Sequence, residues 1–522
     1  MRKRVLLALL LIGISLSAVW THHSFGKAIK TGESTSINRP PKIYPDYSST
    51  VLPPNIAPLN FIVQETGSYY FARIYAQKGN AIEVWSRSPK ILIPENSWRQ
   101  LIENNIGGEV HFDIFVSTDG QQWSRFSTIT NRIASENIDG YLVYRRSHPS
   151  LTLVRGPIGI FQRDLANFDV KVVLDKRRYK AGCMNCHTFY QNRPDKTLIG
   201  VRNVKYGPIT LMINGKKVTK IKAKFGYTAW HPSSKLVVYS LNRLPMVLHT
   251  ANDEIRDTVD MDSTLAYYVF DSDEVKVTPE ISRPDMLETW PAWSADGRFL
   301  YFCRTPMLWT DKEKVPPENY EKIKYDLVRI SYDVANDKWG EVETVVSARD
   351  TNMSVAMPRT SPDGRWLIFC MYDYGAFPPW QKSSDLYIMD LNSVEKTGKF
   401  EYKRMDISSD QSESWHSWSS NSRWIVFSSK REQGAFTRSY ISYIDENGNA
   451  SKPFVVPQED PEFYTFCLDT FNTPEFVTGP ITATGEQLAR GIQSSVASAK
   501  MPMALTTATP QGKKRDSSLD LE

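Results

Sequence analysis

The amino-acid sequence predicts an all-β protein, with an N-terminal β-sandwich followed by a β-propeller. Six blades are expected, and seven are the alternative. The chain of 522 residues contains 14 Trp, 25 Tyr and 23 Phe, and β-strands favour such aromatic residues. From Trp230 onward it repeats one short pattern four times, which is typical of folds built from stacked units. Composition and repeats together therefore predict stacked β-sheets.

The overall composition excludes several classes of protein. Five cysteines in 522 residues are too few for a disulfide scaffold, and a hydrophobic fraction of 41% is too high for a disordered chain. A mean hydropathy of −0.40 excludes a membrane protein with many spans. The net charge of +5 is too dilute to indicate binding to nucleic acid. We therefore expect a large globular protein with no nucleic-acid partner.

The first residues have the order of an export signal. Arg2, Lys3 and Arg4 precede an apolar run over Val5–Trp20, and a basic start followed by a short apolar run is typical of secretion. The run is shorter than the roughly 20 residues that span a bilayer comfortably. We expect residues 1–20 to be a signal peptide or, if uncleaved, a signal anchor. The body of the protein is then expected in the periplasm or cell envelope, with membrane association only through this segment.

The next two stretches differ in pattern. Residues 21–58 are rich in Pro, Ser and Thr, and their prolines oppose both helices and central strands, so we expect a linker. Residues 59–146 contain alternating segments such as Tyr69–Ala76, with a hairpin signal at Asp119–Gly120. One short helix is expected over Ser97–Asn104. A β-sandwich is the simplest fold for residues 59–146.

The hairpin repeat starts at Trp230, Trp293, Thr360 and Trp418. Each copy has a short strand, a tight turn of Pro, Asp, Asn, Gly or Ser, and a second apolar strand. The copies lie roughly 60 residues apart, more than the ~40–45 residues of WD-type blades, which fits four-stranded blades with long loops. Such a unit cannot bury both sheet faces alone, so radial stacking predicts a β-propeller over residues 147–480.

Two further blades complete the expected ring. One is expected over Cys183–Lys222, with a hairpin turn at Asn214–Gly215. The other is expected to join Ile158–Leu174 to the stretch around Phe463–Val477, which would close the ring. Residues 481–522 lack a periodic apolar pattern, so we expect a mobile tail there.

Residues Cys183-Met-Asn-Cys-His187 match Cys-x-x-Cys-His, the attachment sequence of c-type haem. Two thiols at this spacing reach the two vinyl groups of the porphyrin, and the adjacent imidazole reaches the iron. A disulfide or half of a zinc site are the alternatives, but zinc would need another close Cys or His pair. We predict one covalent haem c, with thioethers to Cys183 and Cys186 and with His187 as the proximal ligand.

The second axial ligand of that iron is left open by the sequence. His249 and Met246 follow the first clear repeat hairpin and are the candidates. A five-coordinate iron is the third alternative.

Four charged or titratable residues fall in the first strands of the repeats, namely Glu288, Arg359, Glu413 and His416. Because the first strand of each blade lines the channel of a propeller, they are channel candidates that could meet at one ligand. A ring of solvated or mutually paired charges is the alternative that we favour. The chain has no Gly-x-Ser-x-Gly, His-Glu-x-x-His or phosphate-loop motif, so an enzymatic activity stays uncertain.

The repeats resemble those of TolB-like propellers, best at Trp293-Ser-Ala-Asp-Gly-Arg298 and Thr360-Ser-Pro-Asp-Gly-Arg365. From about Pro53 to Pro480 the chain is similar to exported bacterial proteins, common in Bacteroidota, that join such a propeller to one Cys-x-x-Cys-His. Members are often labelled TolB-like or cytochrome c biosynthesis proteins. The resemblance implies a propeller and a haem, and it implies no catalytic residue.

Two functions follow as hypotheses. The first is a monohaem cytochrome that passes electrons between redox partners of the envelope. The second is a propeller scaffold that binds proteins or a ligand, with a structural or sensory haem. A weaker third is an oxidoreductase arranged like the cytochrome cd-type nitrite reductases, which would need a second cofactor in the channel with His416 as its axial ligand.

Overall fold

The computed structural model describes residues 34–148, 158–179, 183–203, 205–221, 223, 225–248, 256–432 and 434–494. The chain divides into two compact units. The first takes its described residues from Met1–Leu52, Ala57–Ser135 and Pro457–Phe463. The second takes them from Pro53–Ile56, Glu136–Val456 and Tyr464–Glu522.

The first unit contains two sheets and the helix α2 (Glu95–Glu103). The larger, seven-stranded sheet comprises β1 (Ser34–Ile37), β3 (Val51–Leu52), β5 (Tyr69–Ala76), β6 (Ile82–Ser86), β8 (Glu109–Ser117), β9 (Trp123–Phe126) and β10 (Ile129–Ile133). The smaller sheet comprises β2 (Ile43–Tyr44), β4 (Phe61–Val63) and β7 (Lys90–Ile91). The ring of Phe112 lies 6.2 Å from that of Phe61 and 6.3 Å from that of Trp98, so both sheets and α2 share one core.

Part of the expected linker belongs to this first unit. β1 adds to β9 and β3 adds to β10, both in parallel, although residues 21–58 were expected to be a linker. Pro40 and Pro41 lie between strands, and strands added at an edge tolerate neighbouring prolines. The helix begins at Glu95 rather than Ser97, with Pro94 in the N-cap position.

The second unit contains six four-stranded antiparallel sheets within its described residues. The first comprises β13 (Val170–Asp175), β12 (Ile158–Asp164), β11 (Tyr141–Ser147) and β36 (Thr470–Val477); the second comprises β14 (Cys183–Phe189), β15 (Lys196–Asn203), β16 (Gly207–Asn214) and β17 (Lys217–Ile221). The third comprises β18 (Thr228–Trp230), β19 (Leu236–Leu241), β22 (Thr264–Val269) and β23 (Glu274–Lys276); the fourth comprises β24 (Met286–Trp293), β25 (Phe299–Pro306), β26 (Asp326–Asp333) and β27 (Lys338–Val346).

The remaining two sheets follow in chain order. The fifth comprises β28 (Ser354–Thr360), β29 (Trp366–Tyr372), β30 (Asp385–Asp390) and β31 (Tyr402–Arg404); the sixth comprises β32 (Glu413–Trp418), β33 (Trp424–Ser429), β34 (Arg438–Tyr443) and β35 (Phe454–Val455). A two-stranded ribbon of β20 (Met246–Leu248) and β21 (Arg256–Thr258) extends from the third sheet. The helices are α3 (Ala348–Thr351), α4 (Leu391–Thr397), α5 (Phe463–Phe466) and α6 (Gly485–Gln493), and η2 (Lys176–Tyr179), η3 (Tyr320–Lys322) and η4 (Pro378–Trp380) are short 3₁₀ turns.

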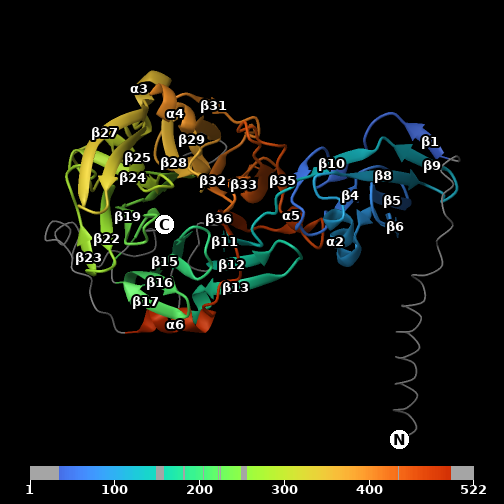
Figure 1. Cartoon of the computed structure of the whole chain (residues 1–522), viewed down its shortest axis with the longest axis horizontal. Coiled ribbons are helices and arrows are strands. Elements are labelled where there is room, and N and C mark those ends of the chain that lie inside the picture. The colour runs from blue at the N-terminus through green and yellow to red at the C-terminus, as the bar shows by residue number, and fades with distance from the viewer. Residues whose placement is uncertain are drawn as a thin grey trace, which may run out of the picture. The chain divides into compact units, whose positions relative to one another are not determined.

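The six sheets surround a common centre (Figure 1). Their innermost strands contact one another in the order β14, β18, β24, β28, β32 and β36, and β36 contacts β14 again. Sheets that close on themselves in this radial way form a β-propeller. The propeller that the repeats predict is therefore confirmed.

The ring closes through a strand that the sequence pattern assigned elsewhere. β36 pairs with β11, from Tyr141 opposite Val477 to Ser147 opposite Thr470, and β11 pairs in turn with β12. We had expected residues 141–146 in the sandwich domain. β11 is buried on both faces over most of its length, as a central strand of the propeller must be.

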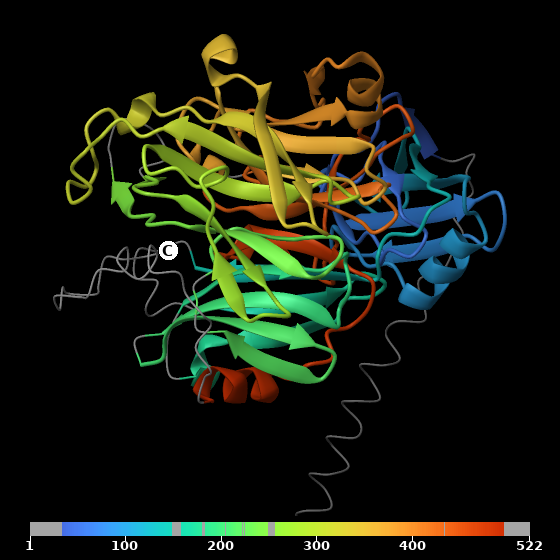
Figure 2. The ribbon, with the colours of Figure 1, turned by 60° about the vertical axis from the view of Figure 1, so that its left-hand side comes forward.

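The helix α6 covers the outside of the first two sheets. It packs against β13, β16 and β17 (Figure 2), and Leu488 and Ile492 are fully buried there. Thr484 caps the helix in a capping box with Gln487. The mobile tail that we expected from residue 481 is thus folded through its described part; the rest of that tail, like residues 1–33 with the expected export signal, lies outside the described residues. Within the described part of the chain, no helix is long and apolar enough to cross a membrane.

Replacing Leu488 with Ala should destabilise the propeller. The substitution removes a fully buried side chain between α6 and the sheets, so we expect the free energy of unfolding to fall by about 2–5 kcal/mol. Urea denaturation measures the change, with Glu486→Ala on the exposed face of α6 as the control. Equal stability of Leu488→Ala and the parent would contradict the packing of α6.

Candidate functional site

The innermost strands of the propeller share an irregularity at one level. The pairing register shifts after Thr289 in β24, after Ala356 in β28, after Ser414 in β32 and after Met184 in β14. β36, the innermost strand of the first sheet, has the same kind of shift, which lies opposite Val143 and Arg145 of β11. Such β-bulges bend a strand and re-aim its side chains. Five innermost strands therefore depart from regular alternation at the same place.

Four of these bulges contain a residue in the left-handed region. The φ angles are 54° at Trp290, 56° at Met357, 50° at Trp415 and 48° at Thr473. A non-glycine residue in this region costs on the order of 1–3 kcal/mol, and such strain gathers at functional sites. The same strain repeated at four equivalent positions points to a function at this level of the channel.

The bulges line one cavity inside the ring. The empty volume of about 540 Å³ includes the open solvent at the mouth, and the enclosed space is far smaller. All six innermost strands contribute to the wall, with Tyr227 preceding β18. The lining residues are His187, Tyr227, Thr228, Trp290, Pro291, Met357, Pro358, Arg359, Trp415, His416, Ser417, Thr473, Pro474 and Glu475.

Aromatic rings form one side of this cavity. Tyr227 and Trp290 stack with their ring centroids 3.3 Å apart, and Trp415 meets Trp290 edge to face at 5.4 Å. The indole nitrogen of Trp290 donates a hydrogen bond to the carbonyl oxygen of Ala376 at 2.9 Å. The wall is therefore held in place before any ligand binds.

His187, from the Cys-x-x-Cys-His motif, lines the cavity from β14. Its side chain is buried, with an exposed fraction of 2%. The backbone carbonyl groups of Val143 and Thr473 face the ring, but neither ring nitrogen makes a hydrogen bond of full geometry with the described residues. Burial lowers the pKa of His187 to about 4, so the imidazole is neutral at pH 7. A buried polar group without a partner costs about 1–3 kcal/mol. Because the neutral imidazole has a single N–H, carbonyl groups can satisfy only that nitrogen, which leaves the other nitrogen for a ligand.

His416 also lines the cavity but is bonded to the strand behind it. Its Nε2 lies 3.1 Å from the carbonyl oxygen of Ile368, and its Nδ1 lies 3.9 Å from the Sγ of Cys370. Since a carbonyl only accepts, Nε2 carries the proton. Burial lowers the pKa of His416 to about 3. Both ring nitrogens thus face β29, and His416 acts as a neutral part of the wall.

Arg359 and Glu475 are the other polar residues of the cavity. Arg359 is half-buried, and its guanidinium makes no hydrogen bond or ion pair with the residues that the structure describes. The Glu475 side chain accepts a hydrogen bond from the backbone N–H of Phe189 at 3.1 Å. Burial raises the pKa of Glu475 to about 7, and the charge of Arg359 partly opposes that rise. The cavity therefore holds one unpaired cation beside a carboxyl that is partly protonated at neutral pH.

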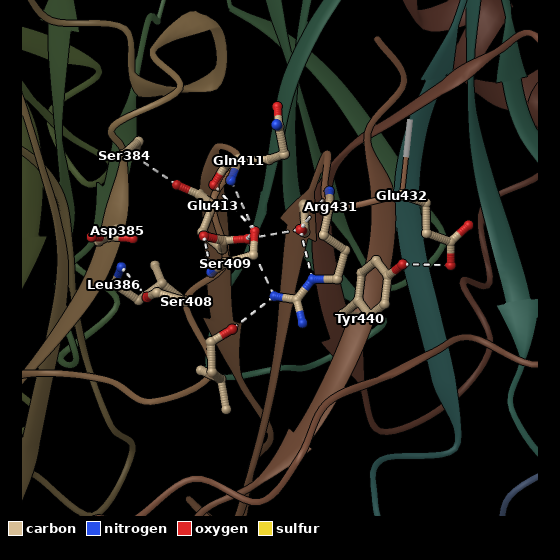
Figure 3. Close-up of polar contacts among 12 residues, drawn as sticks. Ser384, Asp385, Leu386, Ser408, Ser409, Gln411, Glu413, Arg431, Glu432 and Tyr440 are labelled. Atoms are coloured by element: carbon tan, nitrogen blue, oxygen red, sulfur yellow. Dashed lines mark hydrogen bonds and ion pairs between the residues drawn. The ribbon is translucent and has the colours of Figure 1, made fainter. Parts of the chain in front are cut away.

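The two remaining channel candidates lie elsewhere on their strands. Glu413 is fully buried and accepts hydrogen bonds from Ser409, Ser429 and Arg431 (Figure 3). Its repeat equivalent Glu288 is also fully buried and accepts one from the backbone N–H of Arg283. Both glutamates lie in the regular part of their strand, before the bulge. There, side chains alternate between the two faces of the sheet and point toward the neighbouring sheets. Of the four candidates, the structure brings only Arg359 and His416 to the cavity.

The placement of the predicted haem residues is partly described. The backbone of Cys183 and Cys186 belongs to β14, and the side chains of both cysteines lie outside the described residues, as does His249. Met246 lies in the ribbon strand β20 and is not among the described residues that line the cavity. No cluster of three or more potential metal-binding side chains occurs in the described residues.

The sequence pattern did not predict the aromatic wall or Glu475, although it contains a signal for the bulges. A proline stands two residues before the repeat start at Pro291 and at Pro358, and Pro474 lies in the bulge of β36. Because proline cannot donate to a sheet ladder, it occurs within strands mainly at edges and bulges. The residue before each of these prolines takes the left-handed conformation.

Comparison with known proteins gives weak matches. No family model matches the chain, and no curated protein matches it. Prolyl oligopeptidase B from Galerina marginata is 13% identical, covering 66% of this chain and 43% of its own, with a TM-score of 0.33; this chain thus spans less than half of that protein. An oligogalacturonate lyase from Vibrio parahaemolyticus is 11% identical, covering 74% and 100%, with a TM-score of 0.33. Hydrazine synthase from Kuenenia stuttgartiensis is 12% identical, covering 51% and 64%, with a TM-score of 0.29. Likeness at this level assigns neither a family nor an activity.

The burial of Glu288 should make stability depend on pH. Desolvation raises its pKa from 4.5 to about 7, so between these values the unfolded chain releases a proton that the folded chain keeps. The protonated Glu288 side chain therefore contributes fully to the free energy of unfolding below pH 4.5, and this contribution is lost as the pH rises through about 7. Glu288→Gln stays neutral, so we expect it to be more stable than the parent at pH 8, by up to about 3 kcal/mol, and unchanged at pH 4.

Urea denaturation at both pH values measures this effect. Glu395→Gln, at an exposed position, is the control and is expected to change stability at neither pH. If Glu288→Gln lost stability at pH 8, the carboxylate would be stabilised by the fold, contrary to this account.

Proposed function

We propose that the protein is an exported c-type cytochrome with one covalent haem, which passes electrons between redox partners of the cell envelope. Cys183 and Cys186 would form the thioethers, and His187 would bind the iron. The proposal includes the export of the chain through residues 1–20 and its relation to the TolB-like proteins. It also takes the six four-stranded sheets as the six blades of the propeller.

The observation that carries this proposal is the state of His187. Its imidazole is buried and neutral at pH 7, and neither nitrogen makes a hydrogen bond of full geometry among the described residues, although the backbone carbonyl groups of Val143 and Thr473 face the ring. Buried polar groups in folded proteins nearly always have a partner. Iron is the partner that the surrounding Cys-x-x-Cys-His sequence predicts.

The residues around His187 fit a haem. A haem supplies one-electron transfer at a potential that its axial ligands and surroundings set. The partly exposed rings of Tyr227 and Trp415 offer flat apolar surfaces, and the unpaired Arg359 offers a positive charge to an acidic group. In the pairing register, β14 has its bulge between Met184 and His187, so the motif lies at the level where the neighbouring strands line the cavity.

The first test is the haem itself. The protein should be produced in a host that attaches haem to exported proteins, and its pyridine haemochrome spectrum should then show a c-type band. Cys183→Ala/Cys186→Ala should lose that band. His187→Ala should keep the covalent haem but shift its midpoint potential, whereas His231→Ala should not. His231 is the matched control, since it is a buried histidine whose two ring nitrogens contact Ser233 and Gly297. A parent protein without a c-type band would overturn the proposal.

The second test concerns the open axial position. His416, the other histidine of the described cavity, faces β29 with both ring nitrogens, so the second ligand would come from outside the cavity, from His249 or from Met246. If either residue binds the iron, reduced protein should react with CO slowly or not at all, and His249→Ala or Met246→Ala should make the reaction fast. Fast CO binding by the parent would instead show a five-coordinate iron.

The scaffold hypothesis makes a different prediction. A haem that serves electron transfer should be oxidised reversibly and at a rate that depends on a redox partner. If Cys183→Ala/Cys186→Ala binds co-purifying envelope proteins as the parent does, and the parent haem exchanges no electrons with them, the haem is structural or sensory.

A further inference from the structure

We propose that the channel cavity binds a carboxylate carried on a flat apolar body, with Arg359 holding the carboxylate and the Tyr227, Trp290 and Trp415 rings holding the body. The proposal uses the cavity alone and needs no iron, so it goes beyond the haem proposal. The carboxylate could come from the acidic edge of the haem or from a free small molecule. Both sources share this chemistry, and the experiment below separates them.

The unpaired state of Arg359 is the first argument. Arg359 follows the bulge of β28, and its backbone carbonyl oxygen accepts a hydrogen bond from the indole N–H of Trp418 at 3.2 Å, which fixes the start of the side chain. The guanidinium itself pairs with no residue that the structure describes. A half-buried arginine offers five donors in a planar fork, and a carboxylate matches that fork in two parallel hydrogen bonds.

The groups that face Arg359 do not neutralise it. His416 is neutral because burial lowers its pKa to about 3, and its Nε2 donates to the carbonyl oxygen of Ile368. Glu475 is partly protonated at neutral pH, since burial raises its pKa to about 7, and it makes no ion pair with Arg359. The cavity therefore keeps a net positive charge, which favours an anion.

The repeats differ in the residue that they place at this level. The residue directly before the repeat start is Arg359 in the fifth sheet, whereas it is Ala229, Ala292 and Ser417 in the third, fourth and sixth sheets. Arg359 and Ser417 line the cavity, whereas Ala229 packs in a hydrophobic core. Among these four equivalent positions, only Arg359 brings a charge to the cavity.

The aromatic wall is suited to a flat ligand. Tyr227 and Trp415 are partly exposed and line the cavity beside Trp290. Stacked or edge-to-face contacts between aromatic groups are favourable beyond the area that they bury. The hydrogen bond of Trp290 to Ala376 keeps the wall in place, so little order must be gained on binding.

Benzoate is the probe, because it joins one carboxylate to one flat ring. Calorimetric titration should show binding at one site per chain. Benzamide, which has the same shape without the charge, should bind roughly tenfold more weakly or not at all. Arg359→Gln should weaken benzoate binding by roughly tenfold or more, and Arg359→Lys should recover part of it. Arg349→Gln, at an exposed arginine, is the control and should bind benzoate like the parent.

Benzoate binding to the haem-free and the haem-bearing protein distinguishes the two sources of the carboxylate. If the haem-free Cys183→Ala/Cys186→Ala form binds benzoate and the haem-bearing parent does not, the haem edge fills the site. In that case Arg359→Gln should also lower the midpoint potential of the haem, because a positive charge is removed. If both forms bind benzoate, the ligand is a free molecule. Should the double variant not fold, parent protein made without haem attachment replaces it.

The proposal is overturned if benzoate binds to neither form, or if it binds to Arg359→Gln as tightly as to the parent. If the protein carries no haem, the cytochrome proposal is wrong. The benzoate titration of that same protein would still test whether the cavity binds a carboxylate. The two proposals therefore fail separately.

Discussion

A single backbone feature, a β-bulge at one level of the innermost strands, is the constraint on which the channel site depends. In a regular strand, successive side chains point into the two neighbouring sheets. The left-handed residues Trp290, Met357, Trp415 and Thr473 break that alternation and bring side chains of these strands to the cavity. Each costs free energy that the surrounding sheets must supply. A propeller can carry this cost because every innermost strand is fixed by its own sheet and by two neighbours.

Closure of the ring holds these strained strands in place. The sheet that closes it combines β11, from the start of the unit, with β36, from its end. Thr473 and Glu475 lie on β36, so the cavity is complete only when the two ends of the unit have paired. The helix α6 then covers the first two sheets with Leu488 and Ile492. The site and the stability of the ring thus depend on the same contacts.

The periodic hairpin repeats predicted the fold. The features that the repeats did not predict depend on single residues and on distant strand pairing. The hairpin repeats gave the propeller because each repeat must bury both faces of its sheet. β11 was misplaced because its membership in a sheet depends on a partner more than 300 residues away. α6 was missed although Thr484 and Gln487 form a recognisable capping box. In the site, sequence position placed Arg359 and His416 in the channel, but it could not show that one is unpaired and the other bonded to β29.

The central claim is that the bulged level of the channel holds the iron on His187. Anomalous diffraction from a crystal of the haem-bearing protein, measured at the iron absorption edge, tests this most directly. The account predicts one iron peak beside the imidazole of His187, within the cavity that Arg359, Trp290 and Trp415 line. A peak at another place in the protein, or a His187 hydrogen-bonded to protein with no iron nearby, would contradict it.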